Sequence, residues 1–106
     1  MADMSAPTPF SVKVEKSSST CVLKVAGELD IATVGHLRLA FKSCGNADLV
    51  VDLAELTFID STGLGAFIEH EQRCSATGNA FSLINPSKPM LRLLEVAGLT
   101  KRFLRE

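Results

Sequence analysis

Tryptophan and tyrosine are both absent from this sequence, and six phenylalanines are its only residues of the Phe, Trp and Tyr group. Surfaces that stack nucleic-acid bases depend on such rings, so their scarcity argues against base stacking. Eleven basic and twelve acidic side chains give a formal net charge of −1, which supplies no bulk positive field to attract phosphates or anionic membranes. We therefore expect no nucleic-acid partner.

Cysteine is also scarce, and its positions form no recognised motif. Cys21, Cys44 and Cys74 are an odd number, and no two of them form a CxxC pair. The two histidines, His36 and His70, do not complete a metal-ligand spacing with them, so we expect neither a metal nor another cofactor. The simplest interpretation is three reduced thiols in a reducing compartment, and the alternative is a redox-sensitive Cys44–Cys74 pair.

Long apolar runs are missing as well. No stretch approaches the length that spans a bilayer, and the N-terminal residues lack a basic segment followed by an apolar one. We expect a cytoplasmic protein with no direct membrane insertion. The 106 residues, 46% of them hydrophobic, suit one globular domain. Residues 1–9, polar and rich in proline, are predicted to form a flexible tail, and residues 10–106 a single domain.

Hydrophobic periodicity predicts an α/β fold. Alternation favours strands at 10–14 and 21–26, and short apolar runs favour strands at 47–53 and 81–84. Helical spacing places Ile31, Val34, Leu37, Phe41 and Cys44 on one stripe, with Asp30 as the expected helix cap. Further helices are predicted from Asp60 or Ser61 to about 77–79 and from Pro89 to Gly98. This order predicts a mixed four-stranded sheet with three to four helices packed against it.

One segment combines several features of a binding site. Residues 58–65, Phe-Ile-Asp-Ser-Thr-Gly-Leu-Gly, lie where a buried strand gives way to a helix, and this edge of a parallel sheet is where ligands and partners meet the fold. Asp60 or Ser61 can cap the helix, whose first amides carry a positive partial charge. A phosphoryl group on Ser61 would add about −1.5 to −2 charge there and disturb a docked partner. The plainer alternative is a helix cap followed by turn glycines.

Catalytic interpretations lack the residues they need. A serine-hydrolase elbow requires glycine two places before the nucleophile, where this sequence has Ile59. Gly63-Leu64-Gly65 lacks the third glycine of a dinucleotide fingerprint and the Gly-Lys-Ser/Thr of a phosphate loop. Glu69, Glu71 and Arg73 are interpreted as a solvated helix face. We therefore expect no enzyme and no catalytic residue; weak nucleotide binding or hydrolysis near Ser61 is the enzymatic alternative.

Taken together, the motifs resemble the STAS domains of bacterial anti-sigma factor antagonists. The resemblance runs from about Phe10 to Phe103 and is carried by these segments: 27–30 (Gly-Glu-Leu-Asp), 51–53 (Val-Asp-Leu), 58–65, 85–86 (Asn-Pro) and 93–99 (Leu-Leu-Glu-Val-Ala-Gly-Leu). It implies the STAS-like fold and a partner-switching regulator. In such families the unphosphorylated antagonist binds an anti-sigma factor that is also a serine kinase of the histidine-kinase-like ATPase type, and the sigma factor is released.

The resemblance also implies roles for individual residues. The kinase would phosphorylate the serine after the aspartate, here Ser61 with Thr62 as a secondary possibility, and a serine phosphatase would restore the active form. Asp30 would help to present the phosphosite, or act as a helix cap, or both. The implied partner-binding residues are Asp30, Ile31, Asp60, Ser61, Thr62, Gly63 and Gly65. The alternative function is an unswitched docking subunit of a membrane transporter or of a stress-signalling complex.

Overall fold

The computed structural model describes residues 9–104. The flexible tail predicted for residues 1–9 therefore lies outside the described residues, apart from Pro9. Within the described part of the chain, no helix is long and apolar enough to cross a membrane.

The four strands form one mixed sheet in the order β1-β2-β3-β4. They are β1 (Ser11–Lys16), β2 (Thr20–Leu29), β3 (Asp48–Ile59) and β4 (Phe81–Ile84). β1 and β2 form an antiparallel hairpin, whereas β3 runs parallel to both β2 and β4. The predicted four-stranded mixed sheet is confirmed.

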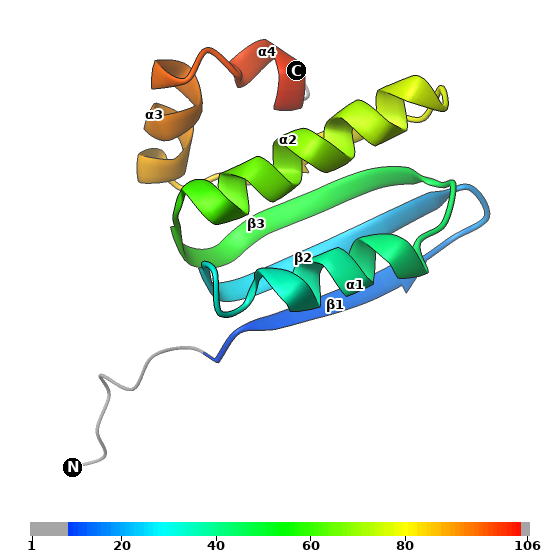
Figure 1. Ribbon diagram of the computed structural model, residues 1–106, viewed down its shortest axis with the longest axis horizontal. Coiled ribbons are helices and arrows are strands. Elements are labelled where there is room, and N and C mark those ends of the chain that lie inside the picture. The colour runs from blue at the N-terminus through cyan, green and yellow to red at the C-terminus, as the bar shows by residue number, and fades with distance from the viewer. Residues whose placement is uncertain (1–8, 105–106) are drawn as a thin grey trace.

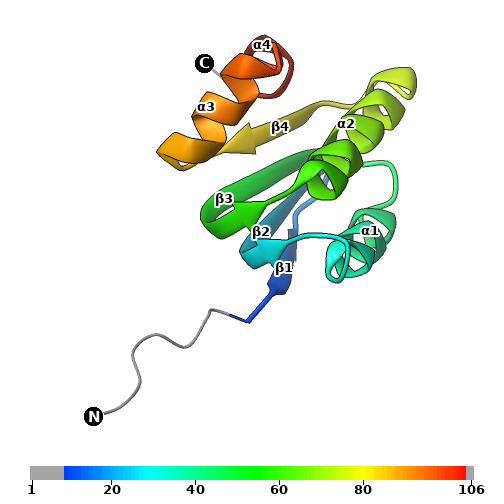
Figure 2. The ribbon, with the colours of Figure 1, turned by 60° about the vertical axis from the view of Figure 1, so that its left-hand side comes forward.

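Four helices accompany the sheet: α1 (Val34–Ser43), α2 (Ser61–Ala76), α3 (Lys88–Val96) and the short α4 (Thr100–Phe103). α1 and α2 lie side by side on one face of the sheet, and α3 and α4 lie near its β4 end (Figures 1 and 2). Helix α4 secures that end because Phe103, which is buried, packs its ring 5.7 Å from the ring of Phe81.

Two strands are longer than the sequence predicts. The pattern predicts that β2 ends at Ala26 and β3 at Leu53, but the two strands continue as neighbours to Leu29 and Ile59. The pairing is irregular between Lys24 and Ala26 and again between Gly27 and Glu28. These irregularities interrupt the two-residue alternation, so the sequence pattern does not reveal that both strands continue.

The start of α1 also differs from the prediction. The helix begins at Val34, its N-cap is Thr33 rather than Asp30, and Ile31 is 79% exposed instead of lying on the buried stripe. The reason is local: the Asp30 carboxylate accepts hydrogen bonds from the backbone N–H groups of Ala32 and Thr33 at 3.0 and 3.2 Å. These bonds form a turn before the helix can start.

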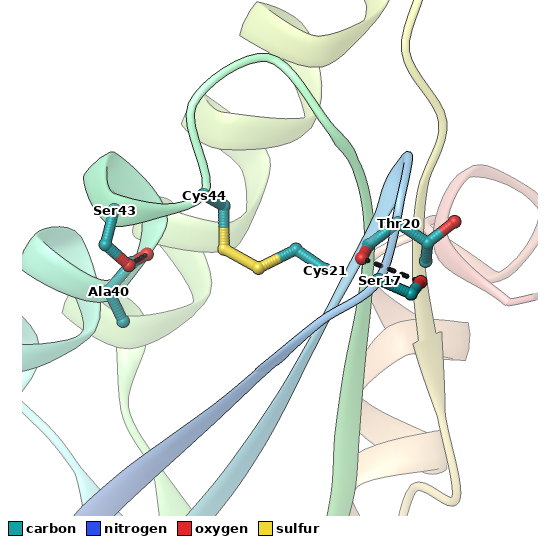
Figure 3. Close-up of a disulfide and its surroundings, with 6 residues drawn as sticks. All are labelled: Ser17, Thr20, Cys21, Ala40, Ser43 and Cys44. Carbon is teal, nitrogen blue, oxygen red and sulfur yellow. Dashed lines mark hydrogen bonds between the residues drawn. A yellow bond between two sulfur atoms is a disulfide. The ribbon is translucent and has the colours of Figure 1, made fainter.

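A disulfide joins Cys21 to Cys44 across a Cα–Cα distance of 6.0 Å (Figure 3). The expectation of three reduced thiols and the alternative Cys44–Cys74 pair are therefore both wrong. Because α1 runs back along β2, the end of the helix meets the beginning of the strand. Cys74 is a free, buried cysteine. Burial raises the pKa of its thiol, and the negative charges of Glu71 and Asp48 raise it further.

Candidate functional site

The candidate site lies at the edge of the sheet where β2 and β3 both end. Leu29 is opposite Ile59 in the parallel pairing, so Asp30 and Asp60 follow from adjacent strand ends. The backbone N–H of Asp60 donates a hydrogen bond to the carbonyl of Leu29 at 3.2 Å and ties the two chain segments together. The structure thus brings the predicted Asp30 and Asp60 loops to one edge.

Asp60 caps α2 as the sequence predicts. Its backbone is extended, and its Oδ1 accepts a hydrogen bond from the Gly63 N–H at 3.1 Å. Its carbonyl accepts one from the Leu64 N–H at 3.0 Å. Ser61 is therefore the first residue of the helix, where it is exposed, and Thr62 beside it is half-buried. This arrangement presents a hydroxyl to solvent at the positive end of the helix dipole.

Gly63 and Gly65 have different structural roles. A Cβ on buried Gly63 would lie 2.7 Å from Cγ of Leu29 and 2.9 Å from Cγ1 of Ile59, so this glycine lets α2 begin directly over the strand ends. Gly65 is exposed, and a Cβ there would meet nothing within 4 Å. Of the two predicted partner-binding glycines, Gly65 lies on the surface, whereas Gly63 is buried against Leu29 and Ile59.

The loop that carries Asp30 is held rigidly by its own hydrogen bonds. Besides the two amides bound by the Asp30 carboxylate, the Thr33 hydroxyl donates to the carbonyl of Glu28 at 2.8 Å and accepts from the Asp30 N–H at 3.0 Å. The loop therefore projects Ile31 outward. Thr33 is not among the residues predicted for the site, although a threonine three residues after an aspartate is a recognisable turn signal.

An apolar surface adjoins the site on the side of α3. Phe58, near the end of β3, is 50% exposed. It lines a cavity of about 160 Å³ together with Leu56, Thr57, Ile59, Ser87, Pro89, Met90 and Leu93. The sequence pattern does not identify these α3 residues as part of a site, because only the tertiary fold places them beside the end of β3.

Neither histidine is connected to Ser61. His36 lies on α1 with its ring 6.1 Å from that of Phe10, and His70 lies on α2, stacked on Phe41 at 4.1 Å. Burial lowers the pKa of His70, and the positive charge of Arg73 lowers it further. Across residues 9–104, no cluster of three or more His, Cys, Asp or Glu side chains could hold a metal ion. The site can thus present a hydroxyl and an apolar surface to another molecule.

Glu69 and Glu71 have ion-pair partners on other elements. The Glu69 carboxylate pairs with Arg38 of α1, and Glu71 accepts a hydrogen bond from Nε of Arg102 at 2.8 Å. Glu69 and Arg73 are exposed, as expected for a solvated helix face, but Glu71 is half-buried and both glutamates are tied to other elements. These pairs join elements about thirty residues apart, which sequence spacing within one helix does not reveal.

Comparison with known proteins finds a matching family model and similar relatives. A family model described as "Mlab, STAS domain" matches residues 12–106. An anti-sigma-B factor antagonist of Bacillus subtilis is 31% identical over 92 residues, which cover 85% of this chain and 84% of that protein.

Two solved structures are similar to this fold. An anti-sigma factor antagonist from Mycobacterium paratuberculosis has a TM-score of 0.80 and 27% identity, with 94% of this chain and 87% of that chain covered. The anti-sigma factor antagonist SpoIIAA in its unphosphorylated form has a TM-score of 0.77 and covers 89% of this chain and 86% of that one. At 22% identity, the second likeness concerns the fold.

Proposed function

This chain belongs to the STAS-domain family of anti-sigma factor antagonists, and from that premise we propose a phosphorylation-controlled partner switch. In its unphosphorylated form the protein binds an anti-sigma factor, which is also a serine kinase of the histidine-kinase-like ATPase type, and so releases the sigma factor. Phosphorylation of Ser61 ends the binding, and a serine phosphatase restores it. The protein works in the cytoplasm as a binding partner and not as an enzyme.

The observation that carries this proposal is the exposed Ser61 at the first position of α2. A kinase needs an accessible hydroxyl, and Ser61 is exposed while the neighbouring cap, Asp60, holds the helix start in place. Thr62 is half-buried, which favours Ser61 as the principal site and Thr62 as the secondary one.

The charges around Ser61 explain how phosphorylation would act. A phosphoserine adds about −1.5 to −2 charge at the helix N-terminus, where the helix dipole favours it. Asp60 and Asp30 already place two carboxylates at this edge, so the new charge makes the surface strongly anionic. The fold tolerates the modification, whereas a partner that matched the hydroxyl form meets repulsion and excess bulk.

The proposed contact surface consists of the two loops and the first turn of α2. Ile31, at 79% exposure, supplies an apolar contact, and exposed Gly65 allows close approach of a partner backbone. Asp30 and Asp60 fix the loops on either side. Gly63 acts indirectly, since it sets the position of the helix start against Leu29.

Affinity capture from the native lysate tests the switch. The baits are the wild-type protein, Ser61→Glu and the matched control Ser75→Glu, which adds the same charge at an exposed residue near the other end of α2. Wild type and Ser75→Glu should capture a histidine-kinase-like ATPase, identified by mass spectrometry, and Ser61→Glu should lose it. Equal capture of that ATPase by all three baits would contradict switching at Ser61.

A second candidate function follows from the capping geometry. The Asp60–Gly63 hydrogen bond explains the Asp-Ser-Thr-Gly sequence as a helix start that needs no phosphorylation. In that case the protein is an unswitched docking subunit of a membrane transporter or of a stress-signalling complex. Capture of such a complex equally by wild type and Ser61→Glu, with no phosphate on Ser61 in protein isolated from cells, supports this alternative.

A further inference from the structure

A groove of about 350 Å³ runs between α1 and α2 on the outer side of these helices. Its walls and floor are formed by Gly35, Arg38, Leu39, Phe41 and Lys42 from α1 and by Ala66, Glu69, His70 and Arg73 from α2. The two helices run in the same direction and begin at the edge that carries Ser61 (Figure 1). The groove is therefore separate from the candidate site but starts close to it.

The charge of the groove is opposite to that of the whole chain. Arg38, Lys42 and Arg73 are balanced there by Glu69 alone, which leaves an excess of two positive charges in a protein of net charge −1. Arg38 is paired with Glu69, whereas within residues 9–104 neither Lys42 nor Arg73 forms an ion pair. Lys42 and Arg73 thus line the groove without an ion-pair partner, although the charge of Arg73 acts on Glu69 and helps to lower the pKa of its carboxyl.

The groove also has an apolar component. Leu39 is 66% exposed at its rim, and the Phe41–His70 stack and Ala66 lie along it. Burial and the charge of Arg73 lower the pKa of His70, so its ring is predominantly neutral near pH 7. A suitable ligand therefore needs both carboxylates and apolar side chains, which is the chemistry of an acidic peptide segment. Three cations are too few for a nucleic-acid or membrane surface.

We propose that the groove between α1 and α2 binds an acidic, partly apolar segment of the anti-sigma partner. The identity of the partner rests on the proposed function, but the chemistry of the segment rests on Arg38, Lys42, Arg73 and the apolar floor. Ala66 follows Ser61 by five residues, or about 7.5 Å along the helix axis, so one partner can cover both surfaces. The groove would then hold a second part of the partner beside the switched contact.

The Arg38–Glu69 pair gives this proposal a specific consequence. Glu69 occupies Arg38 in the free protein and competes with a carboxylate of the incoming segment. Replacement of Glu69 by glutamine removes this internal competitor. An acidic ligand should therefore bind Glu69→Gln more tightly than wild type, which a purely structural role of the ion pair would not produce.

The test is a titration followed by ¹H–¹⁵N NMR. The probe is a capped eight-residue peptide in which glutamate alternates with leucine, and its counterpart carries glutamine in place of every glutamate. The glutamate peptide should shift the amide signals of α1 and α2 along the groove. Its Kd should weaken at least about fivefold in Lys42→Gln/Arg73→Gln and tighten about twofold in Glu69→Gln.

The matched control is Lys88→Gln/Arg92→Gln, which removes two exposed cations of α3, outside the groove. This variant should bind the peptide as wild type does. Equal losses in the two double variants, equal binding of the glutamine peptide, or shifts spread over the whole surface would overturn the proposal. Failure here leaves the Ser61 capture experiment unaffected, and loss of switching at Ser61 does not alter binding of the peptide, so the two proposals are tested separately.

Discussion

Gly63 and Gly65 lie two residues apart in α2, and their surroundings predict opposite effects of the same substitution. Gly63→Ala places a Cβ 2.7 Å from Leu29 and should destabilise the protein by about 1–3 kcal/mol. Gly65→Ala meets open space and should stabilise it by about 0.5–1 kcal/mol through helix propensity. Urea unfolding of both variants measures the difference, and equal free energies of unfolding would contradict this account of the helix start.

Gly65 has a further consequence at the same scale. An exposed glycine inside a helix weakens that helix, and no contact within the described chain requires it. The proposed role in partner contact would account for it, because a side chain there would hold a partner backbone away. Gly65→Ala should therefore raise stability and at the same time lower capture of the proposed ATPase partner. Unchanged capture would remove Gly65 from the proposed contact surface.

His70 predicts a pH dependence of stability. Burial and Arg73 lower the pKa of His70, with Glu69 opposing them, while the ring packs against Phe41 and Phe81. As the pH falls through the unfolded value of about 6.5, the unfolded chain binds a proton more readily than the folded one. The free energy of unfolding should thus decrease between pH 6.5 and the lower pKa of the folded state.

The variant His70→Gln should lose this part of the pH dependence. The matched control, His36→Gln, changes an exposed histidine on α1 and retains His70, so its pH profile should keep the wild-type slope. Chemical unfolding measured in steps from about pH 7.5 to pH 5.5 compares the three proteins above the range in which most carboxylates titrate. Parallel profiles for wild type and His70→Gln would show that the histidine is not responsible.

At the scale of elements, the Cys21–Cys44 disulfide fixes the end of α1 to the beginning of β2. The two residues are 23 positions apart. Closing a loop of this length lowers the conformational entropy of the unfolded chain, which stabilises the folded state by about 3.5 kcal/mol. Reduction should lower the free energy of unfolding of wild type by about this amount and leave Cys44→Ser unchanged. Thiol titration of the oxidised, unfolded protein should detect one cysteine, Cys74; three reactive thiols would contradict the pairing.

The sequence predicts the elements better than their ends. Alternation and helical spacing give the hairpin, the order of strands and helices, and the capped start of α2 at Asp60 and Ser61. They do not give the continuation of β2 and β3 to Leu29 and Ile59, because the pairing irregularities break the pattern. They also place the start of α1 too early, since the turn made by Asp30 competes with the helix.

For the site, local chemistry was predictable and tertiary proximity was not. The Asp60 cap follows from a short acceptor side chain before a helical run, and the structure confirms it. The contact of Gly63 with Leu29, the cavity beside Phe58 and the Cys21–Cys44 pair all join segments distant in sequence. A single sequence contains no signal for these contacts, because each depends on how the whole sheet positions its helices.

At the scale of the molecule, two surfaces meet near one end of the fold. The edge with Asp30, Ile31 and Ser61 is proposed to switch, and the groove between α1 and α2 is proposed to hold an acidic segment without switching. Phosphorylation then weakens one contact and leaves the other intact. Loss of the Ser61 contact alone should measurably reduce the affinity for the partner. The physical cause is like-charge repulsion and unfavourable desolvation at the phosphorylated serine.

The most direct measurement is isothermal titration calorimetry, which gives the affinity of the captured anti-sigma partner for two forms of this protein, unphosphorylated and phosphorylated at Ser61. The proposed switch predicts that the phosphorylated form binds at least about tenfold more weakly, a difference of about 1.4 kcal/mol. Ser61→Ala should bind like the unphosphorylated protein and accept no phosphate at this position. Equal affinity of the two forms would contradict the central claim that Ser61 controls binding.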